Sequence, residues 1–366
     1  MPRSRAAVYD GATPKHIDVR DFEVPEFGPA GELVLRTRRC GVCGSDLHRW
    51  SWSKETPVIL GHEILGVVEQ APHGWLAADG TPLQVGDLVV PETRIPCHTC
   101  EFCRGVGSRP SKQIDYSHCP NQRGLGGIRL NEMPLLSGGW SDYVELPNGA
   151  IVHKIPPEVD REEAVLLEPF SIGMKASRVA DVNQDDTVLI LGPGPIGLLA
   201  TVACHVVGAK RVILAGRAGD EERLALGREL GAHATIDVGE GDPVEKLKAL
   251  NNGRLATRVI EATGVAAAIE LGLTMLDRGG VLVTVGGHRP DARITLNPSD
   301  LVWTQREIRG MQLGALNYES CIGVMASRRY PLRKMLTHRF ELPDIQRALE
   351  TFAERGGCIK PVIVFD

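Results

Sequence analysis

The chain has 366 residues, of which 43% are hydrophobic and 24% charged, fractions typical of a soluble globular protein rather than a disordered or fibrous one. This length exceeds the roughly 250–300 residues at which a single hydrophobic core stops growing, so we expect two domains. The formal net charge is −5 with dispersed lysine and arginine, which argues against nucleic acid as a partner.

The N-terminal residues contain no apolar segment of the kind that directs export, so we expect a cytoplasmic protein. One run, residues 188–209, lacks charged residues and is long enough for a membrane span. Glycine and proline interrupt it near its start, however, so a strand, a tight turn and a helix explain it better, and we expect no membrane partner. Nine cysteines without an export signal favour metal binding or catalysis over disulfides.

Short β-prone runs separated by glycine and proline occupy residues 5–147 and predict a small, barrel-like β domain. Between residues 186 and 287, apolar strands alternate with helical stretches, which predicts an α/β domain with a parallel, doubly wound sheet. Residues 358–365 return to strand-like sequence and could rejoin the first domain. The strands predicted for the second domain are Val188–Leu191, Val212–Leu214, Arg258–Ile260 and Val281–Val285.

A first set of possible metal ligands lies early in the chain. Residues 41–48 contain Cys43 and His48, and His62 and Glu63 follow. One thiolate, imidazoles and carboxylates suit a catalytic zinc, which typically has about three protein ligands and one position for water or substrate. Taken singly, each residue also has an ordinary interpretation: Cys43 as a small core residue, His62 as a hydrogen-bonded core histidine and His48 as a surface one.

A second set is a cluster of cysteines. Three of them follow one another at intervals of three residues, and a fourth comes after a longer gap. Four thiolates suit a closed tetrahedral zinc site that stabilises the fold, although His98 and His118 are alternatives for the fourth ligand. The cluster consists of Cys97, Cys100, Cys103 and Cys119.

A predicted strand, 187–191, leads into Gly192-Pro193-Gly194-Pro195-Ile196-Gly197 and then into an apolar helix, 198–207. A G-x-G-x-x-G motif between a strand and a helix is typical of a Rossmann dinucleotide site. Gly192 permits the turn, Gly194 lets the backbone approach the pyrophosphate, and Gly197 permits close packing of the helix. The helix N-terminus would face the phosphates, with Pro195 and Ile196 beside them.

The next predicted strand indicates which dinucleotide binds. The acidic residue that normally receives the ribose hydroxyls of NAD about 20 residues after the motif is missing. Instead the strand ends in Gly216 and Arg217, and Arg223 follows, which leaves room and charge for a 2′-phosphate. NADP(H) is therefore favoured over NAD(H), although the acidic residues 220–222 could repel a phosphate or bind a ribose.

Two later strands of the same sheet end in Glu261-Ala262-Thr263-Gly264 and Val285-Gly286-Gly287. Ligands of such sheets bind at the carboxyl ends of the strands. Thr263, Val285 and Gly286 are therefore candidate cofactor contacts.

Taken in order, Gly-Val-Cys-Gly-Ser-Asp-x-His, Gly-His-Glu, the cysteine cluster and Gly-Pro-Gly-Pro-Ile-Gly resemble the zinc-containing medium-chain dehydrogenases/reductases of the alcohol dehydrogenase superfamily. The segment 168–173, Glu-Pro-Phe-Ser-Ile-Gly, is similar to the polyol (sorbitol) and threonine dehydrogenase branch, in which glutamate replaces a cysteine ligand of zinc. The resemblance implies a GroES-like β-barrel catalytic domain, residues 1–160 and 311–366, and a Rossmann domain, residues 161–310.

The resemblance also implies the ligands of two zinc ions per chain. By matching motif, Cys43 and His62 would bind the catalytic zinc, and Glu63 and Glu168 would be direct or water-mediated ligands. The four cysteines would bind a structural zinc. The gap from Cys103 to the fourth cysteine is about twice that usual in the family, and we favour a surface decoration for the loop 105–117, which includes Arg109, Lys112 and Tyr116.

Three further residues would act in catalysis if the resemblance holds. Ser45 would bond the substrate oxygen and pass its proton on, and His48 would relay the proton to solvent. Asp46 would orient the ring of His62. The implied reaction transfers a hydride between a secondary alcohol and NAD(P) and gives the ketone, with a polyol, a cyclic alcohol or a hydroxy amino acid as substrate.

Two alternatives remain open, a zinc-independent NADPH reductase of the same superfamily and a catalytically silent NADPH-binding protein. The combination of Cys43, His62 and Glu168 argues against the first, and the apparent proton relay argues against the second. Related enzymes are commonly homodimers or homotetramers, which we expect here. Four tryptophans are either pocket residues or ordinary core and interface aromatics: Trp50, Trp52, Trp140 and Trp303.

Overall fold

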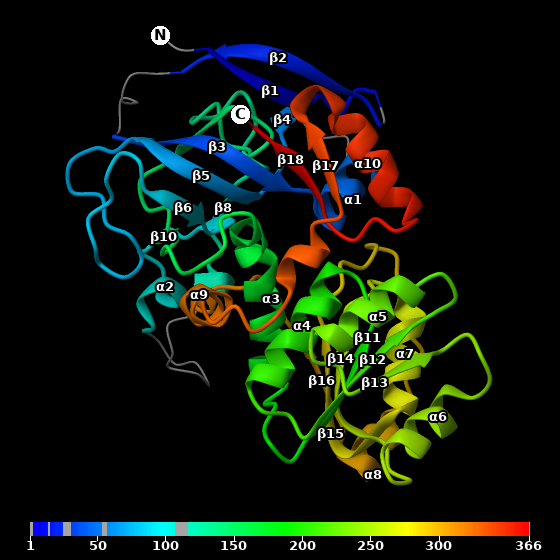
Figure 1. Ribbon diagram of the computed structural model, residues 1–366. Coiled ribbons are helices and arrows are strands. Elements are labelled where there is room, and N and C mark those ends of the chain that lie inside the picture. Colours follow the sequence, from blue (N-terminus) through cyan, green and yellow to red (C-terminus); the bar gives the residue numbers. More distant parts are fainter. Residues whose placement is uncertain (1–2, 14, 25–30, 53–56, 107–115, 366) are drawn as a thin grey trace. The chain divides into compact units, whose positions relative to one another are not determined.

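The computed structural model describes residues 3–13, 15–24, 31–52, 57–106 and 116–365 (Figure 1). The chain divides into two compact units. The first comprises Met1–Glu168, Tyr318–Ser327 and Met335–Asp366, and the second comprises Pro169–Asn317 and Arg328–Lys334.

This division differs from the domains expected from the sequence at residues 161–168, 311–317 and 328–334. Residues 161–168 belong to the first unit, because the 3-10 helix η2 (Glu163–Leu166) packs on strands of that unit. Residues 311–317 belong to the second unit, where the Lys175 Nζ donates a 3.2 Å hydrogen bond to the carbonyl of Gln312. The expected bounds follow sequence motifs, whereas this division follows contacts between residues.

Among the described residues, the first unit contains three β-sheets. One has the order β2-β1-β4, the largest has the order β10-β6-β5-β3-β18-β17, with β9 also paired to β3, and the third is the pair β7 (Arg94–Ile95) and β8 (Arg123–Gly124). The expectation that the C-terminal residues rejoin this unit is confirmed, because β18 (Pro361–Val364) runs antiparallel to β3 (Leu33–Gly41), with Val362 opposite Gly41. The other strands are β1 (Arg3–Tyr9), β2 (Ile17–Glu23), β4 (Val58–Ile59), β5 (Glu63–Gln70), β6 (Leu88–Pro91), β9 (Tyr143–Leu146), β10 (Val152–Lys154) and β17 (His338–Glu341).

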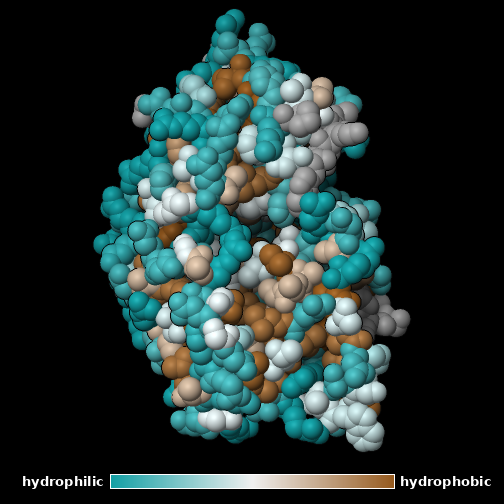
Figure 2. Space-filling view, turned by 90° about the vertical axis from the view of Figure 1, so that its right-hand side faces the viewer, coloured by the Kyte–Doolittle hydropathy of each residue, from teal (hydrophilic) through white to brown (hydrophobic). Residues whose placement is uncertain are grey.

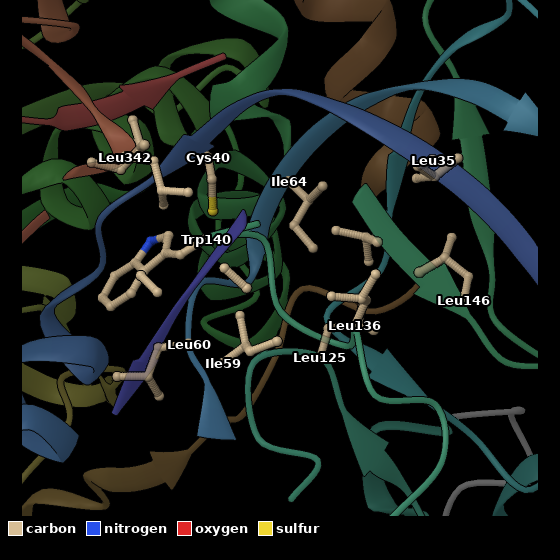
Figure 3. Packing of buried hydrophobic residues seen from close by; sticks show 14 of the residues in the cluster. Leu35, Cys40, Ile59, Leu60, Ile64, Leu125, Leu136, Trp140, Leu146 and Leu342 are labelled. Atoms are coloured by element: carbon tan, nitrogen blue, oxygen red, sulfur yellow. The ribbon is translucent and has the colours of Figure 1, made fainter. Parts of the chain in front are cut away.

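The core of the first unit gathers inward-facing residues from several of these strands, as the alternation of buried and exposed positions along a strand predicts. Figure 3 shows Leu35, Ile64, Trp140 and Leu146 in this cluster. Trp50 and Trp140 are 3% and 0% exposed and belong to the core, so the ordinary interpretation holds for both. The side chain of Trp52 lies outside the described residues.

The second unit contains one parallel sheet, with the order β13-β12-β11-β14-β15-β16. The expected doubly wound Rossmann sheet is therefore confirmed, and the order reverses direction at β11 and β14, where such folds bind ligands. Figure 1 shows the connecting helices packed along the strands. The strands are β11 (Thr187–Leu191), β12 (Arg211–Gly216), β13 (Ala234–Asp237), β14 (Ala256–Glu261), β15 (Leu276–Thr284) and β16 (Glu307–Gly310).

Shorter strands and the helices complete both units. No helix within the described ranges has the length and apolar character that crossing a bilayer would need. The helices and remaining strands are α1 (Gly44–Trp52), α2 (Glu101–Arg104), α3 (Leu167–Val179), α4 (Pro195–Val206), α5 (Glu221–Glu229), α6 (Pro243–Leu250), α7 (Ala266–Thr274), α8 (Pro298–Thr304), α9 (Tyr318–Ala326), α10 (Ile345–Glu354), η1 (Tyr116–His118), η3 (Leu332–Met335), η4 (Leu342–Asp344), β7 (Arg94–Ile95) and β8 (Arg123–Gly124).

The turn between β11 and α4 depends on glycine. The helix begins at Pro195 rather than at the predicted residue 198, because proline suits the first helical position. Gly192 has φ +101°, which other residues rarely adopt. A Cβ at Gly197 would lie 1.8 Å from the Gly192 carbonyl oxygen, whereas one at Gly194 would meet no atom within 4 Å.

Gly197→Ala should therefore lower the free energy of unfolding by about 1–3 kcal/mol, the usual cost of overpacking, since the added methyl group displaces backbone. Gly194→Ala is the matched control and should change it by less than about 1 kcal/mol, because its methyl group enters open space. Equilibrium urea denaturation followed by circular dichroism measures both, and equal stability of the two variants would contradict this packing.

Candidate active site and metal centres

The first predicted ligand set comes together in the first unit. Ligand atoms of Cys43, His62 and Glu63 all lie within 4.8 Å of one another. The pairing of β3 with β5 causes this, because Gly41 lies opposite Glu63 and so brings the residues after one strand against the start of the other. A thiolate, an imidazole and a carboxylate at such separations fit a zinc ion.

The ring of His62 is held on its Nδ1 side by Asp46. The Asp46 Oδ1 lies 3.3 Å from this nitrogen, and its Oδ2 accepts a 2.9 Å hydrogen bond from the backbone N–H of Cys43. Burial opposes a charged ring, but Asp46 and Cys43 outweigh it and raise the pKa of His62 well above its ordinary value. A carboxylate on the outer nitrogen of a histidine is the usual support of a zinc ligand.

Ser45 and His48 lie on α1, three residues apart and thus on one face of the helix. The Ser45 Oγ is 3.5 Å from His62 Nε2, the nitrogen opposite Asp46. His48 is half-buried, and this burial lowers the pKa of its imidazole. The helix therefore presents a hydroxyl beside the ligand cluster and an imidazole along the same face.

Glu168 lies beside this cluster but outside the group of three. Its Oε1 accepts a 2.7 Å hydrogen bond from the Thr93 hydroxyl, and the residue is only 5% exposed. Burial raises the pKa of Glu168; Glu63 adds to this rise, and His62 opposes it. Glu63 and Glu168, the two carboxylates predicted as alternative ligands, thus both lie near His62 but have different hydrogen-bond partners.

Lys360 is a residue of this site that the sequence did not reveal. Its Nζ lies 2.6 and 2.8 Å from the two carboxylate oxygens of Glu63 and donates a 3.1 Å hydrogen bond to the carbonyl of Val42. The residue is 1% exposed, and Glu63 raises the pKa of Lys360 in spite of its burial. Only the pairing of β18 with β3 brings it here, so no local motif could have identified it.

The cysteine cluster forms as predicted in position. The four sulfur atoms of Cys97, Cys100, Cys103 and Cys119 lie within 4.8 Å of one another. His98 instead contacts the carbonyl of Gly149 at 2.8 Å, and His118 stacks on Phe102, so neither alternative histidine belongs to the group.

The electrostatics of the cluster fit a bound cation. Hydrogen bonds from Thr99 and the backbone N–H of Cys100 lower the pKa of Cys97 to about 5. Burial and the neighbouring thiols raise the pKa of Cys103 to about 12. A divalent cation would remove this mutual repulsion, and four thiolates suit zinc.

Arg109 and Lys112 of the long loop lie outside the described residues, whereas the Tyr116 hydroxyl donates a 2.7 Å hydrogen bond to Glu92.

The predicted dinucleotide contacts occupy the carboxyl edge of the parallel sheet in the second unit. Arg217 is exposed just after β12, and its backbone N–H donates a 3.1 Å hydrogen bond to Asp220. Arg223 is 8% exposed, and its Nε lies 3.9 Å from Asp220. Of the two arginines that the sequence predicted beside a 2′-phosphate, Arg217 is exposed and Arg223 is buried.

Glu261, fully buried at the end of β14, organises the other two predicted contact segments. Its Oε1 accepts hydrogen bonds of 2.6 and 2.9 Å from the backbone N–H groups of Thr263 and Gly264, and its Oε2 lies 3.1 Å from His288 Nε2. The Val285 N–H donates a 2.9 Å hydrogen bond to its carbonyl. The carboxylate thus holds these loops together, a role that the sequence did not assign.

Comparison with known proteins agrees with this geometry. An alcohol dehydrogenase GroES-like domain matches residues 29–157, and a zinc-binding dehydrogenase domain matches residues 195–327. Erythritol/L-threitol dehydrogenase of Mycolicibacterium smegmatis is 30% identical over 96% of this chain and 95% of that protein. The chain belongs to the zinc-containing alcohol dehydrogenase superfamily.

Another relative places the chain near the sorbitol branch of these medium-chain dehydrogenases, and a solved structure shares its fold. Sorbitol dehydrogenase of Bacillus subtilis is 29% identical over 95% of this chain and 94% of that protein. The solved structure of an alcohol dehydrogenase from Thermotoga maritima has a TM-score of 0.88 and 27% identity, covering 100% of both chains. The predictions of a GroES-like domain and of an NAD(P)-dependent alcohol dehydrogenase are confirmed.

Lys360→Met should lower the free energy of unfolding by about 3–5 kcal/mol, because it leaves the buried Glu63 carboxylate without its partner. Lys248→Met removes an exposed lysine paired with Glu245 on α6 and should leave stability unchanged. Denaturant titration of both variants measures the difference. A Lys360 variant as stable as the control would show that this ion pair does not support the site.

Proposed function

We propose that this dehydrogenase oxidises a secondary hydroxyl of a polyol to a ketone, with NADP⁺ favoured over NAD⁺, and catalyses the reverse reduction. The observation that carries the proposal is the cluster of Cys43, His62 and Glu63, with a hydroxyl, Ser45, against the same histidine. The names of the erythritol/L-threitol and sorbitol dehydrogenase relatives support the polyol class.

Two zinc ions per chain fit the donor sets. Cys43 and His62, with Glu63 or Glu168, would hold one ion, and the four cysteines would hold the other. Zinc in the first site would supply a Lewis acid that lowers the pKa of the substrate hydroxyl. Because Lys360 holds both oxygens of Glu63, we propose that Glu168 is the carboxylate able to move toward the metal position.

Residues of the chain would transfer the proton of the substrate hydroxyl to solvent. Asp46 accepts the Nδ1–H of His62 and so directs Nε2 to the metal position. The Ser45 hydroxyl would accept the proton of the alcohol while it donates its own proton toward His48, on the same face of α1, and His48 would release a proton to solvent. The nicotinamide of the dinucleotide supplies the hydride acceptor.

The dinucleotide would lie along the carboxyl edge of the parallel sheet. The open space at Gly194 lets the pyrophosphate approach the N-terminus of α4. Gly216 and the exposed Arg217 suit a 2′-phosphate, which supports NADP(H). The loops held by Glu261, with Thr263, Val285 and Gly286, would contact the nicotinamide half.

We also propose a cytoplasmic homodimer or homotetramer. β16 ends the parallel sheet among the described strands, and an edge strand can pair with a second copy. Val302 and Trp303 of the adjacent α8 are 71% and 74% exposed, which suits a subunit contact. Figure 2 shows hydrophobic residues gathered over the lower part of one face.

The direct test assays the purified enzyme with polyols, cyclic secondary alcohols and β-hydroxy amino acids, each with NAD⁺ and NADP⁺, while zinc is measured on the same sample. We expect two zinc ions per chain and cofactor reduction with polyols, faster with NADP⁺ and lost on chelation. Zinc only in the cysteine cluster, or turnover that survives complete removal of zinc, would exclude the proposed chemistry.

Ser45→Ala should lower kcat by about 10²–10⁴-fold, the usual contribution of a positioned proton-transfer group. Ser327→Ala, which removes an exposed hydroxyl just after α9, is the matched control and should retain full activity. Steady-state kinetics with the preferred polyol measures both variants. A Ser45 variant with the kcat of the control would remove the hydroxyl from the relay.

A further inference from the structure

Arg94, next to Thr93 in the first unit, is a partly buried cation whose side chain has no hydrogen-bond partner among the described residues. Solvent does not reach its Nε, and this atom bonds no group of the described chain. Over the same residues, Arg94 forms no ion pair with Glu168 or with any other carboxylate. Burying a guanidinium without a partner costs free energy, so proteins rarely retain one that has no ligand.

The position of Arg94 is built by its neighbours. Across the pairing of β7 with β8 it lies opposite Gly124, and a Cβ at Gly124 would be 2.5 Å from Arg94 Nη1. The missing side chain of Gly124 therefore provides the space that the guanidinium occupies. A random surface arginine would need no such space.

A second arginine contacts the glycine-rich segment 124–127. Arg49 of α1 donates from Nη1 to the carbonyl of Gly126, and its two terminal nitrogens lie 2.9 Å from where a Cβ of Gly127 would be. The two guanidinium groups lie near each other, because Gly124 and Gly127 are neighbours whose backbones share a 3.0 Å hydrogen bond from the Gly127 N–H to the Gly124 carbonyl. Burial and the positive charge of Arg49 accordingly lower the pKa of Arg94. Like charges held near each other suit an anionic ligand.

This segment adjoins the candidate metal site. A Cβ at Gly126 would lie 2.8 Å from the carbonyl oxygen of Gly61, the residue before His62. On the other side, Thr93 donates to Glu168, and the charge of Glu168 raises the pKa of Arg94. Both arginines therefore lie within electrostatic reach of the place where the substrate hydroxyl would react.

We propose that Arg94, with Arg49 beside it, binds an anionic group on the substrate, so that the preferred substrate is a polyol carrying a carboxylate or a phosphate. The proposal rests on the polyol dehydrogenase function above and specifies its substrate class. A planar guanidinium matches the paired oxygens of either anion, and the anion would provide the hydrogen-bond acceptors that Arg94 lacks. Both anions share this chemistry, and kinetics distinguishes them.

The test compares a neutral hexitol, the corresponding hexonate and the corresponding hexitol phosphate as substrates of the wild-type enzyme and of Arg94→Gln. We expect kcat/KM of the wild type to be at least about tenfold higher for one of the two anions. In Arg94→Gln, the ratio of anionic to neutral kcat/KM should fall about 10- to 100-fold through KM, as for loss of charged hydrogen bonds. Arg94→Lys should show an intermediate fall, because lysine keeps the charge but not the planar fork.

Arg20→Gln, which removes an exposed arginine paired with Asp18, is the matched control and should leave that ratio unchanged. Inorganic phosphate is a second probe: it should compete with the neutral hexitol in the wild type, and at least about tenfold more weakly in Arg94→Gln. Melting temperature is a third readout, and Arg94→Gln should not lower it, because the wild-type guanidinium has no partner to lose.

The outcomes separate the two proposals. A wild type that prefers the neutral hexitol, or an Arg94 variant in which neutral and anionic substrates decline equally, would overturn the anion site and leave polyol oxidation intact. If Arg94→Gln does not fold, Arg94→Lys decides by the same ratio. A wild type that oxidises none of the three hexose derivatives, nor any neutral polyol, would instead remove the proposed function itself.

Discussion

The buried contact between Lys360 and Glu63 connects the C-terminal strand to the candidate metal site. Because β18 pairs with β3, and β3 pairs with β5, one lysine near the end of the chain reaches a carboxylate beside His62. Neither charge would be tolerated alone in this interior. The register of these three strands therefore also determines the geometry of the ligand cluster. Displacement of any one of them would leave an unpaired buried charge.

In the second unit too, a buried carboxylate organises the candidate ligand-binding edge of the sheet. The Glu261 carboxylate accepts backbone hydrogen bonds from the loop after β14, and its carbonyl accepts one from the residue after β15. The glycines of the turn after β11 leave the N-terminus of α4 uncovered by side chains. Rigid loops around an open helix end are what an anionic dinucleotide requires, since the protein then binds it without reorganising.

Arg94 departs from this pattern of satisfied charges. Around it, Lys360 pairs with Glu63, Glu168 accepts from Thr93, and Asp46 contacts His62, so most buried charges of the site have partners within the chain. Proteins retain a costly feature of this kind where function needs it, since stability alone would remove it. In the proposal above, this guanidinium binds an anionic group of the substrate and so sets a preference that the general chemistry of the fold does not.

The sequence by itself determined the features that depend on short spacing. The three-residue intervals of Cys97, Cys100 and Cys103, and the strand, turn and helix around Gly192 and Gly197, specify their geometry locally, so a motif suffices to predict them. The parallel sheet followed from alternating apolar strands and helices, because that order leaves few arrangements. Motif resemblance extended the prediction to His62 and Glu168, whose proximity local spacing alone does not establish.

Only the tertiary structure decided which charges meet. It placed Lys360 on Glu63 and Arg94 over Gly124, and it buried Arg223 near Asp220. It also placed Trp50 and Trp140 in the core. Each of these facts depends on strand register or on burial. Both arise from contacts between residues that can be far apart in the chain, and local motifs do not specify which of those residues meet.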